Sequence, residues 1–139
     1  MKTKSKISIA LILLALIILP TLNSCNKYPD GPAFSLRMRS HRVVNTWKVE
    51  NYKINGDDFT SLVTSYNETF SKSGSYTYSW SFFSGTGKWA FQNNDMEIKL
   101  TGDDDQSSRT LYILKLEEDA FWYYYKEGDD RHEFHLISK

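Results

Sequence analysis

The chain contains 139 residues, of which 17 are basic and 17 acidic, so its formal net charge is zero. This length suits one globular domain, and a chain without excess basic charge lacks the electrostatic footprint of a nucleic-acid-binding protein. Aromatic residues make up 15% of the chain. Tyrosine and tryptophan in such numbers favour β-strands over helices.

The first 24 residues have the pattern of a lipoprotein signal peptide. Lys2, Lys4 and Lys6 precede residues 7–19, which are apolar at all but one position, and Pro20 ends the run. A membrane-spanning helix needs roughly 18 or more apolar residues, so this run is too short to be a membrane anchor on its own. We therefore expect residues 1–24 to be removed during export.

The residues around the single cysteine resemble a lipobox. Leu22 lies at position −3, Ser24 at −1 and Cys25 at +1 relative to the expected cleavage site. The alternative is an ordinary secretory signal followed by a chance cysteine. We prefer lipidation, because an exported protein with one unpaired thiol otherwise needs an explanation and a lipid on Cys25 removes that thiol.

Lipid on Cys25 would anchor the protein to a membrane of the cell envelope. Two or three acyl chains hold a protein stably, because each buried methylene contributes about 0.8 kcal/mol. Asn26 stands where an aspartate would signal inner-membrane retention, so the outer membrane is favoured, with its periplasmic and outer faces both open. Loss of Lys2, Lys4 and Lys6 with the signal peptide leaves 14 basic against 17 acidic residues, a net charge of −3.

Residues 25–42 are interpreted as the lipidated amino terminus and a tether. Pro29 and Gly31 interrupt this segment, and no sustained apolar period follows them. Its basic side chains could touch anionic headgroups, but a solvated basic linker is the more common arrangement. These side chains are Arg37, Arg39, His41 and Arg42.

The β pattern begins directly after the tether and changes parity within the first strand. Trp47 and Val49 share one strand face, whereas Tyr52 and Ile54 continue the apolar series on the opposite parity. A β-bulge or bend near residues 50–51 would return both pairs to the same side of a sheet.

Residues 43–139 form the predicted domain, and most of it alternates with the period of a half-buried strand. Residues 57–65 are ambiguous, since they fit either one helical turn capped by an aspartate or a long loop. In the clearest strand, Tyr76, Tyr78, Trp80 and Phe82 alternate with serine and threonine, which predicts one wholly aromatic face. Other strands are expected at residues 66–71, 96–101, 109–117, 120–126 and 131–138 and around Trp89 and Phe91.

These elements predict an all-β domain of about eight antiparallel strands, arranged as an up-and-down barrel or a sandwich. Asn45-Thr46-Trp47, Ser73-Gly74-Ser75-Tyr76 and Gly87-Lys88-Trp89 resemble segments of the small lipocalin-like domains on lipoproteins of Gram-negative bacteria. The resemblance spans most of residues 36–139 and implies a barrel whose first-strand tryptophan, Trp47, closes the floor. Asn45 replaces the glycine of a lipocalin Gly-x-Trp, so the resemblance implies the wider lipocalin-like group and carries over no ligand site.

Catalytic and metal-binding patterns are weak. His132 and His135 lie three apart on an expected strand and so point to opposite faces, which separates them as ligands of one metal. The acidic run 103–105 lacks the ligand spacing of a calcium loop and is interpreted as a solvated loop. The serines lack a nucleophile elbow. We therefore expect neither an enzyme nor a cofactor or metal.

Two hypotheses for binding remain open. In the first, the barrel interior holds a small apolar ligand, since eight strands leave room for side chains or one small molecule. The bulky side chains favour a filled core over a cavity. The candidate ligand or core residues are Trp47, Tyr78, Trp80, Trp89 and Phe91.

In the second hypothesis, the outer surface of the domain binds an envelope protein or a glycan. Residues 121–125 are all aromatic, so one parity of this strand faces outward. Aromatic side chains exposed in a row mark contact surfaces. The candidate contacts are Trp122 and Tyr124, unless a neighbouring strand or segment covers them.

Overall fold

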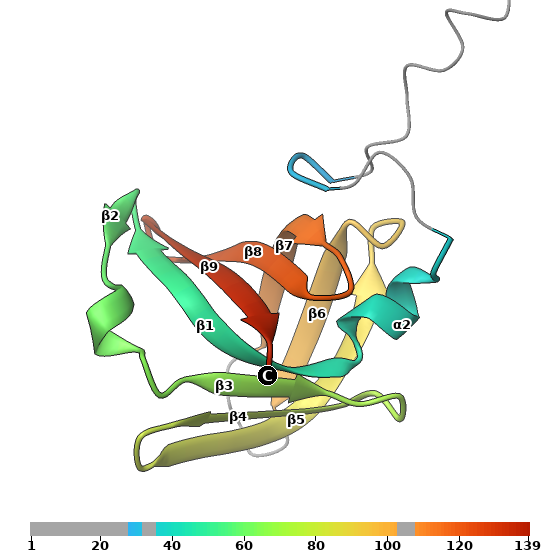
Figure 1. Ribbon diagram of the computed structural model, residues 1–139, viewed down its shortest axis with the longest axis horizontal. Helices are drawn as coiled ribbons and strands as arrows, with labels where there is room; N and C mark the ends of the chain where they lie inside the picture. The colour runs from blue at the N-terminus through green and yellow to red at the C-terminus, as the bar shows by residue number, and fades with distance from the viewer. Residues whose placement is uncertain (1–27, 32–35, 103–107) are drawn as a thin grey trace, which may run out of the picture.

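The computed structural model describes residues 28–31, 36–102 and 108–139, and its strands form a closed barrel (Figure 1). Apart from a two-residue strand that pairs only with the first strand, each strand pairs antiparallel with the next along the chain. The last strand, β9 (Asp130–Ser138), returns to pair with the first, β1 (Asn45–Ile54), which closes the sheet. The predicted all-β, eight-stranded, up-and-down architecture is confirmed, as a barrel. The expected signal peptide (residues 1–24), Cys25 and the acidic run 103–105 lie outside the described residues.

The elements follow one another with short connections. A helix, α2 (Arg39–Val43), precedes β1 (Asn45–Ile54), the two-residue strand β2 (Asp57–Asp58) and a 3₁₀ turn, η2 (Thr60–Leu62). No helix in these described ranges is long and apolar enough to cross a bilayer. The remaining strands are β3 (Asn67–Phe70), β4 (Ser75–Trp80), β5 (Phe83–Gln92), β6 (Glu97–Gly102), β7 (Arg109–Leu116), β8 (Ala120–Glu127) and β9 (Asp130–Ser138).

The parity change in β1 is a β-bulge, as predicted. The register of β1 against β9 shifts between Val49 and Asn51. Trp47 before the shift and Tyr52 after it are both buried, so the bulge keeps both side chains inside the barrel.

The aromatic face of β4 is shorter than predicted. The strand ends at Trp80, and Ser81 adopts a left-handed conformation with φ 53°. This turn carries Phe82 out of the sheet, where its side chain is 99% exposed. The alternation predicted Phe82 on the same face as Tyr76, and that prediction is wrong because a left-handed turn residue breaks the period-two pattern.

The two ends of the barrel differ, and we name them by their elements. The closed end carries α2 and the β5–β6 and β7–β8 turns, and the open end carries β2, η2 and the β4–β5 and β8–β9 turns (Figure 1). Trp47 is fully buried and its Nε1 donates a hydrogen bond to the carbonyl oxygen of Val43 at 2.9 Å. Its ring centroid lies 5.7 Å from that of Phe121, and the same buried core includes Phe70, Leu116 and Leu136.

Part of the segment expected as a tether packs on the closed end. Tyr28 is 2% exposed and donates a hydrogen bond from its hydroxyl to the carbonyl oxygen of Asp95 at 2.8 Å. The Asp30 amide donates to the carbonyl oxygen of Leu114 at 2.9 Å. Arg42 in α2 is buried, donates to the carbonyl oxygen of Leu116, and has its pKa lowered by burial. Residues 28–31 and α2 therefore belong structurally to the closed end.

Candidate ligand-binding site

A cavity of about 520 Å³ occupies the open half of the barrel. Its mouth lies at Leu62 and Trp80, which are 61% and 40% exposed, and its depth is lined by buried side chains such as Phe134, 5% exposed. The expectation of a filled barrel holds for the closed half and is wrong for the open half. Almost half of the residues that line it are aromatic: Tyr52, Tyr66, Tyr76, Tyr78, Trp80, Tyr125 and Phe134.

Glycines occupy inward positions on two neighbouring strands, β5 and β6. Gly85 and Gly87 pair with the inward-facing Tyr78 and Tyr76, and Gly87 pairs in turn with Gly102. At three inward positions the wall thus carries no side chain. Gly87 is also required by close approach, since a Cβ there would lie 2.5 Å from the carbonyl oxygen of Thr101. Of these three glycines, Gly102 lines the cavity.

Part of the cavity mouth is formed by residues 57–65, whose structure the sequence left ambiguous. Residues 57–62 form β2 and a single 3₁₀ turn, which agrees with the helical-turn alternative. Asp58 Oδ1 accepts a hydrogen bond from the Thr60 amide at 2.8 Å, and the Thr60 hydroxyl accepts one from the Tyr52 amide at 2.9 Å. Trp80 Nε1 donates to the Leu62 carbonyl oxygen at 3.1 Å. These bonds tie the rim of the cavity to β1 and β4.

A buried carboxyl group lies behind two tyrosines of the cavity wall. Glu68 is 1% exposed, and its Oε2 accepts hydrogen bonds from the hydroxyls of Tyr76 at 2.8 Å and Tyr66 at 3.2 Å. Burial raises the pKa of Glu68 to about 7, although the Tyr76, Tyr123 and Tyr66 hydroxyls act in the opposite direction. Burial likewise raises the pKa of Tyr66, Tyr76 and Tyr123 well above the usual value. Glu68 Oε1 has no hydrogen-bond partner among the described residues.

A second polar group lines the cavity near its mouth. Arg109 is paired in register with the buried Leu100, so its side chain starts on the inner face of β7. Its guanidinium carbon lies 3.9 Å from the centroid of the Tyr125 ring. His132 stacks on the same ring with 4.9 Å between centroids, and its Nδ1 lies 2.7 Å from the Tyr52 hydroxyl. Polar groups from β1, β7, β8 and β9 therefore meet on one side of the cavity.

The five interior candidates from the sequence separate into two groups. Tyr78 and Trp80 line the cavity. Trp47 belongs to the closed-end core, and Trp89 is half-buried with its Nε1 donating to the Ser71 carbonyl oxygen at 2.9 Å. Phe91 packs edge-on against Trp89 with 5.6 Å between ring centroids. The last three side chains stabilise the barrel and do not touch the cavity.

The outer candidates face outward as their parity requires, but neighbouring side chains cover much of them. Trp122 is half-buried and stacks on His135 with 4.0 Å between centroids. Tyr124 stacks on Tyr112 at 4.9 Å, and the guanidinium carbon of Arg131 lies 4.0 Å from its ring centroid. This matches the alternative in which neighbours cover the aromatic run.

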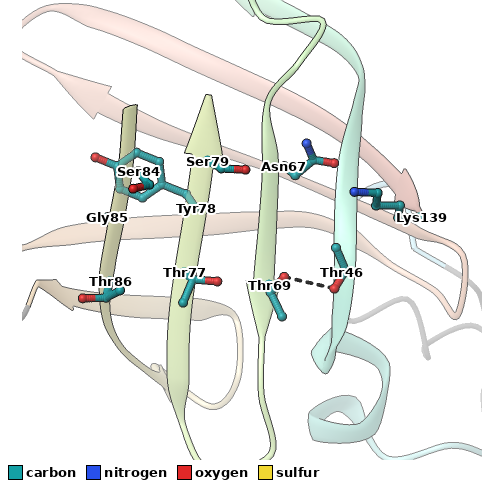
Figure 2. A pocket seen from close by; sticks show the side chains of 10 residues that line it. All are labelled: Thr46, Asn67, Thr69, Thr77, Tyr78, Ser79, Ser84, Gly85, Thr86 and Lys139. Atoms are coloured by element: carbon teal, nitrogen blue, oxygen red, sulfur yellow. Dashed lines mark hydrogen bonds between the residues drawn. The ribbon is translucent and has the colours of Figure 1, made fainter. Parts of the chain in front are cut away.

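A shallower hollow of about 350 Å³ lies on the outer face of β1, β3, β4 and β5 (Figure 2). The strand register aligns Thr46, Thr69, Thr77 and Thr86 in one row across these strands. The Thr46 and Thr69 hydroxyls are 3.0 Å apart, and Ser79, Ser84 and Asn67 form a second row beside them (Figure 2). Small neutral polar groups thus dominate this hollow.

Glu68 and Arg109 were not among the candidate residues expected from the sequence. Their parity was readable, because Glu68 has the same strand parity as the apolar Phe70, and Arg109 the same parity as Leu111. A charged residue in phase with buried apolar neighbours is the signal that could have found them. Within the ranges that the structure describes, no group of three His, Cys, Asp or Glu side chains could hold a metal ion.

Comparison of the chain with protein-family models and with curated proteins finds no match. The topology therefore assigns the fold: a closed, eight-stranded, antiparallel up-and-down barrel, consistent with a lipocalin-like domain.

Proposed function

We propose that this protein is a lipid-anchored envelope protein whose barrel binds a small amphipathic molecule without chemically changing it. The main support for this proposal is the cavity in the open half of the barrel. Ligand pockets typically measure about 300–1,000 Å³, are lined mainly by apolar and aromatic side chains, and contain a few polar groups that fix orientation. The open half of the barrel, at about 520 Å³, has this size and this lining.

The arrangement of polar groups supports binding rather than catalysis. The Tyr66 and Tyr76 hydroxyls hydrogen-bond to Glu68, and Tyr52 contacts His132. These contacts hold the side chains of the wall in place before a ligand arrives, which lowers the entropy lost on binding. The expected lipid on Cys25 supports a place in the cell envelope.

Titration with a neutral fluorescent dye tests the proposal. N-phenyl-1-naphthylamine brightens in apolar surroundings, and we expect its emission to rise saturably with one site per chain. Val63 lines the cavity and is 6% exposed, so Val63→Phe would fill part of the space and weaken binding. Trp122→Ala, on the outer face, is the matched control and should leave binding unchanged.

Two results would count against the interior site. One is the absence of saturable dye binding by a protein whose near-ultraviolet circular dichroism shows native packing. The other is binding that survives Val63→Phe and disappears in Trp122→Ala, which would place the site on the outer aromatic surface.

A further inference from the structure

We propose that Arg109 makes the cavity selective for an organic anion with an aromatic body, such as an aryl carboxylate or sulfonate. This inference rests on the proposed function and names the class of molecule that the cavity would take. Its basis is a guanidinium group that lines an aromatic cavity and has no counterion within the described structure.

The pairing of Arg109 differs from that of every other arginine in the described ranges. Arg37, Arg39 and Arg131 form ion pairs with Glu118, Asp95 and Glu133 at 3.1, 3.0 and 2.7 Å, and Arg42 donates to a backbone carbonyl oxygen. Arg109 has neither kind of partner there, and its guanidinium carbon lies 3.9 Å from the centroid of the Tyr125 ring. Among the described arginines, Arg109 is thus the one whose guanidinium N–H groups form neither an ion pair nor a hydrogen bond with a described residue.

Glu68 does not serve as the missing counterion. Its carboxylate is buried behind Tyr66 and Tyr76, whose hydroxyls both donate to Oε2. No guanidinium nitrogen of Arg109 comes within 4.0 Å of a carboxyl oxygen of Glu68 in the described structure. The positive group at the wall therefore stays available to a bound molecule.

An anionic ligand would supply what Arg109 lacks. A guanidinium group presents its N–H donors in a planar fork that fits the two oxygens of a carboxylate or sulfonate. A charge removed from water is costly unless it is paired, so a ligand anion at this position gains both a counterion and oriented hydrogen bonds. Tyr125 holds the guanidinium from one side through a cation–π contact.

The aromatic side chains of the cavity wall favour a ligand with a flat ring system. Tyr78, Trp80, Phe134 and Tyr125 all contribute aromatic rings to the cavity wall. Aromatic faces prefer offset or edge-on contact with other rings, so a planar ring system gains more here than a flexible chain of the same size.

Two dyes with the same ring system isolate the role of charge. 8-Anilinonaphthalene-1-sulfonate carries a sulfonate that N-phenyl-1-naphthylamine lacks. We expect wild-type protein to bind the sulfonate dye more tightly, and Arg109→Met to weaken that dye about ten- to hundredfold, as loss of a charged hydrogen-bonded contact does. Binding of the neutral dye should change less than about threefold, which also shows that the variant folds. Arg109→Lys should retain part of the preference.

Arg131→Met is the matched control. Arg131 lies over the face of Tyr124 at 4.0 Å on the outside of the barrel, as Arg109 lies over Tyr125 inside it. Its replacement should leave the affinity of both dyes unchanged.

The outcomes separate this inference from the function on which it rests. If Arg109→Met weakens both dyes equally, or neither, while both still bind, the cavity binds ligands but is not selective for anions. If Arg131→Met weakened binding of the sulfonate dye as much as Arg109→Met does, the preference for this dye would come from the overall charge of the protein and not from Arg109. If neither dye binds native wild-type protein, the proposed function itself fails.

Discussion

The buried carboxyl group of Glu68 predicts that the folded domain loses stability as the pH rises from 5 to 8. The pKa of this group is about 7 in the folded protein and 4.5 in the reference state. The folded state therefore holds a proton that the unfolded state releases. The resulting stabilisation is fully present below pH 4.5 and is lost as the pH rises through 7. At 1.36 kcal/mol for each pKa unit, the difference amounts to at most about 3 kcal/mol.

Glu68→Gln should remove this dependence. Its amide oxygen can still accept the hydrogen bonds of Tyr66 and Tyr76, and the side chain cannot ionise. Urea unfolding of both proteins at pH 5 and pH 8 gives the free energies of unfolding. We expect the wild type to lose on the order of 3 kcal/mol more than the variant between these two conditions.

Glu50→Gln, which replaces an exposed carboxylate at the β1 bulge, is the control and should keep the wild-type pH dependence. The result that refutes the reasoning is a wild-type protein whose stability changes with pH just as that of Glu68→Gln does. Such a result would mean that Glu68 is ionised in the folded domain throughout this range, with its charge compensated.

Three further predictions concern the anchor and the packing. Cys25→Ser should leave an unprocessed precursor or move the protein out of the detergent phase in phase separation, and normal processing with unchanged partition would contradict lipidation. Trp47→Ala should cost about 3–5 kcal/mol of unfolding free energy in urea titrations, because the side chain is fully buried and hydrogen-bonded. Gly87→Ala should cost about 1–3 kcal/mol in the same assay, because its Cβ would lie 2.5 Å from the Thr101 carbonyl oxygen. If either variant unfolded at the same urea concentration as the wild type, the packing assigned to Trp47 or Gly87 would be contradicted.

The strands were predictable where one face is buried and the other solvated. Ile98 and Leu100 alternate with polar residues and are buried as expected, and the parity change between Val49 and Tyr52 located the bulge. The end of β4 was not predictable, because the left-handed conformation of Ser81 depends on how the hairpin closes. Alternation reports which face a side chain occupies but not where the chain leaves the sheet.

The cavity was harder to predict than the barrel around it. Sequence parity places side chains inside, but the space they leave depends on which inward positions face one another across strands. Gly87 and Gly102 become neighbours only in the β5–β6 register. The Glu68 cluster likewise requires Tyr76 from β4 and Tyr123 from β8 to meet in the interior. These contacts join residues that lie far apart in the sequence, so no local sequence pattern predicts them.

If Cys25 carries a lipid, the docking of Tyr28 sets the direction in which the cavity mouth points relative to the membrane. Two residues separate Cys25 from Tyr28, and three steps of extended chain span at most about 10 Å. With Tyr28 fixed at the closed end, a lipid on Cys25 would hold that end beside the bilayer surface. The opposite end, with the cavity mouth, would then face the aqueous compartment. A molecule entering the barrel would come from solution or from a soluble donor, and the anchoring membrane would not be its direct source.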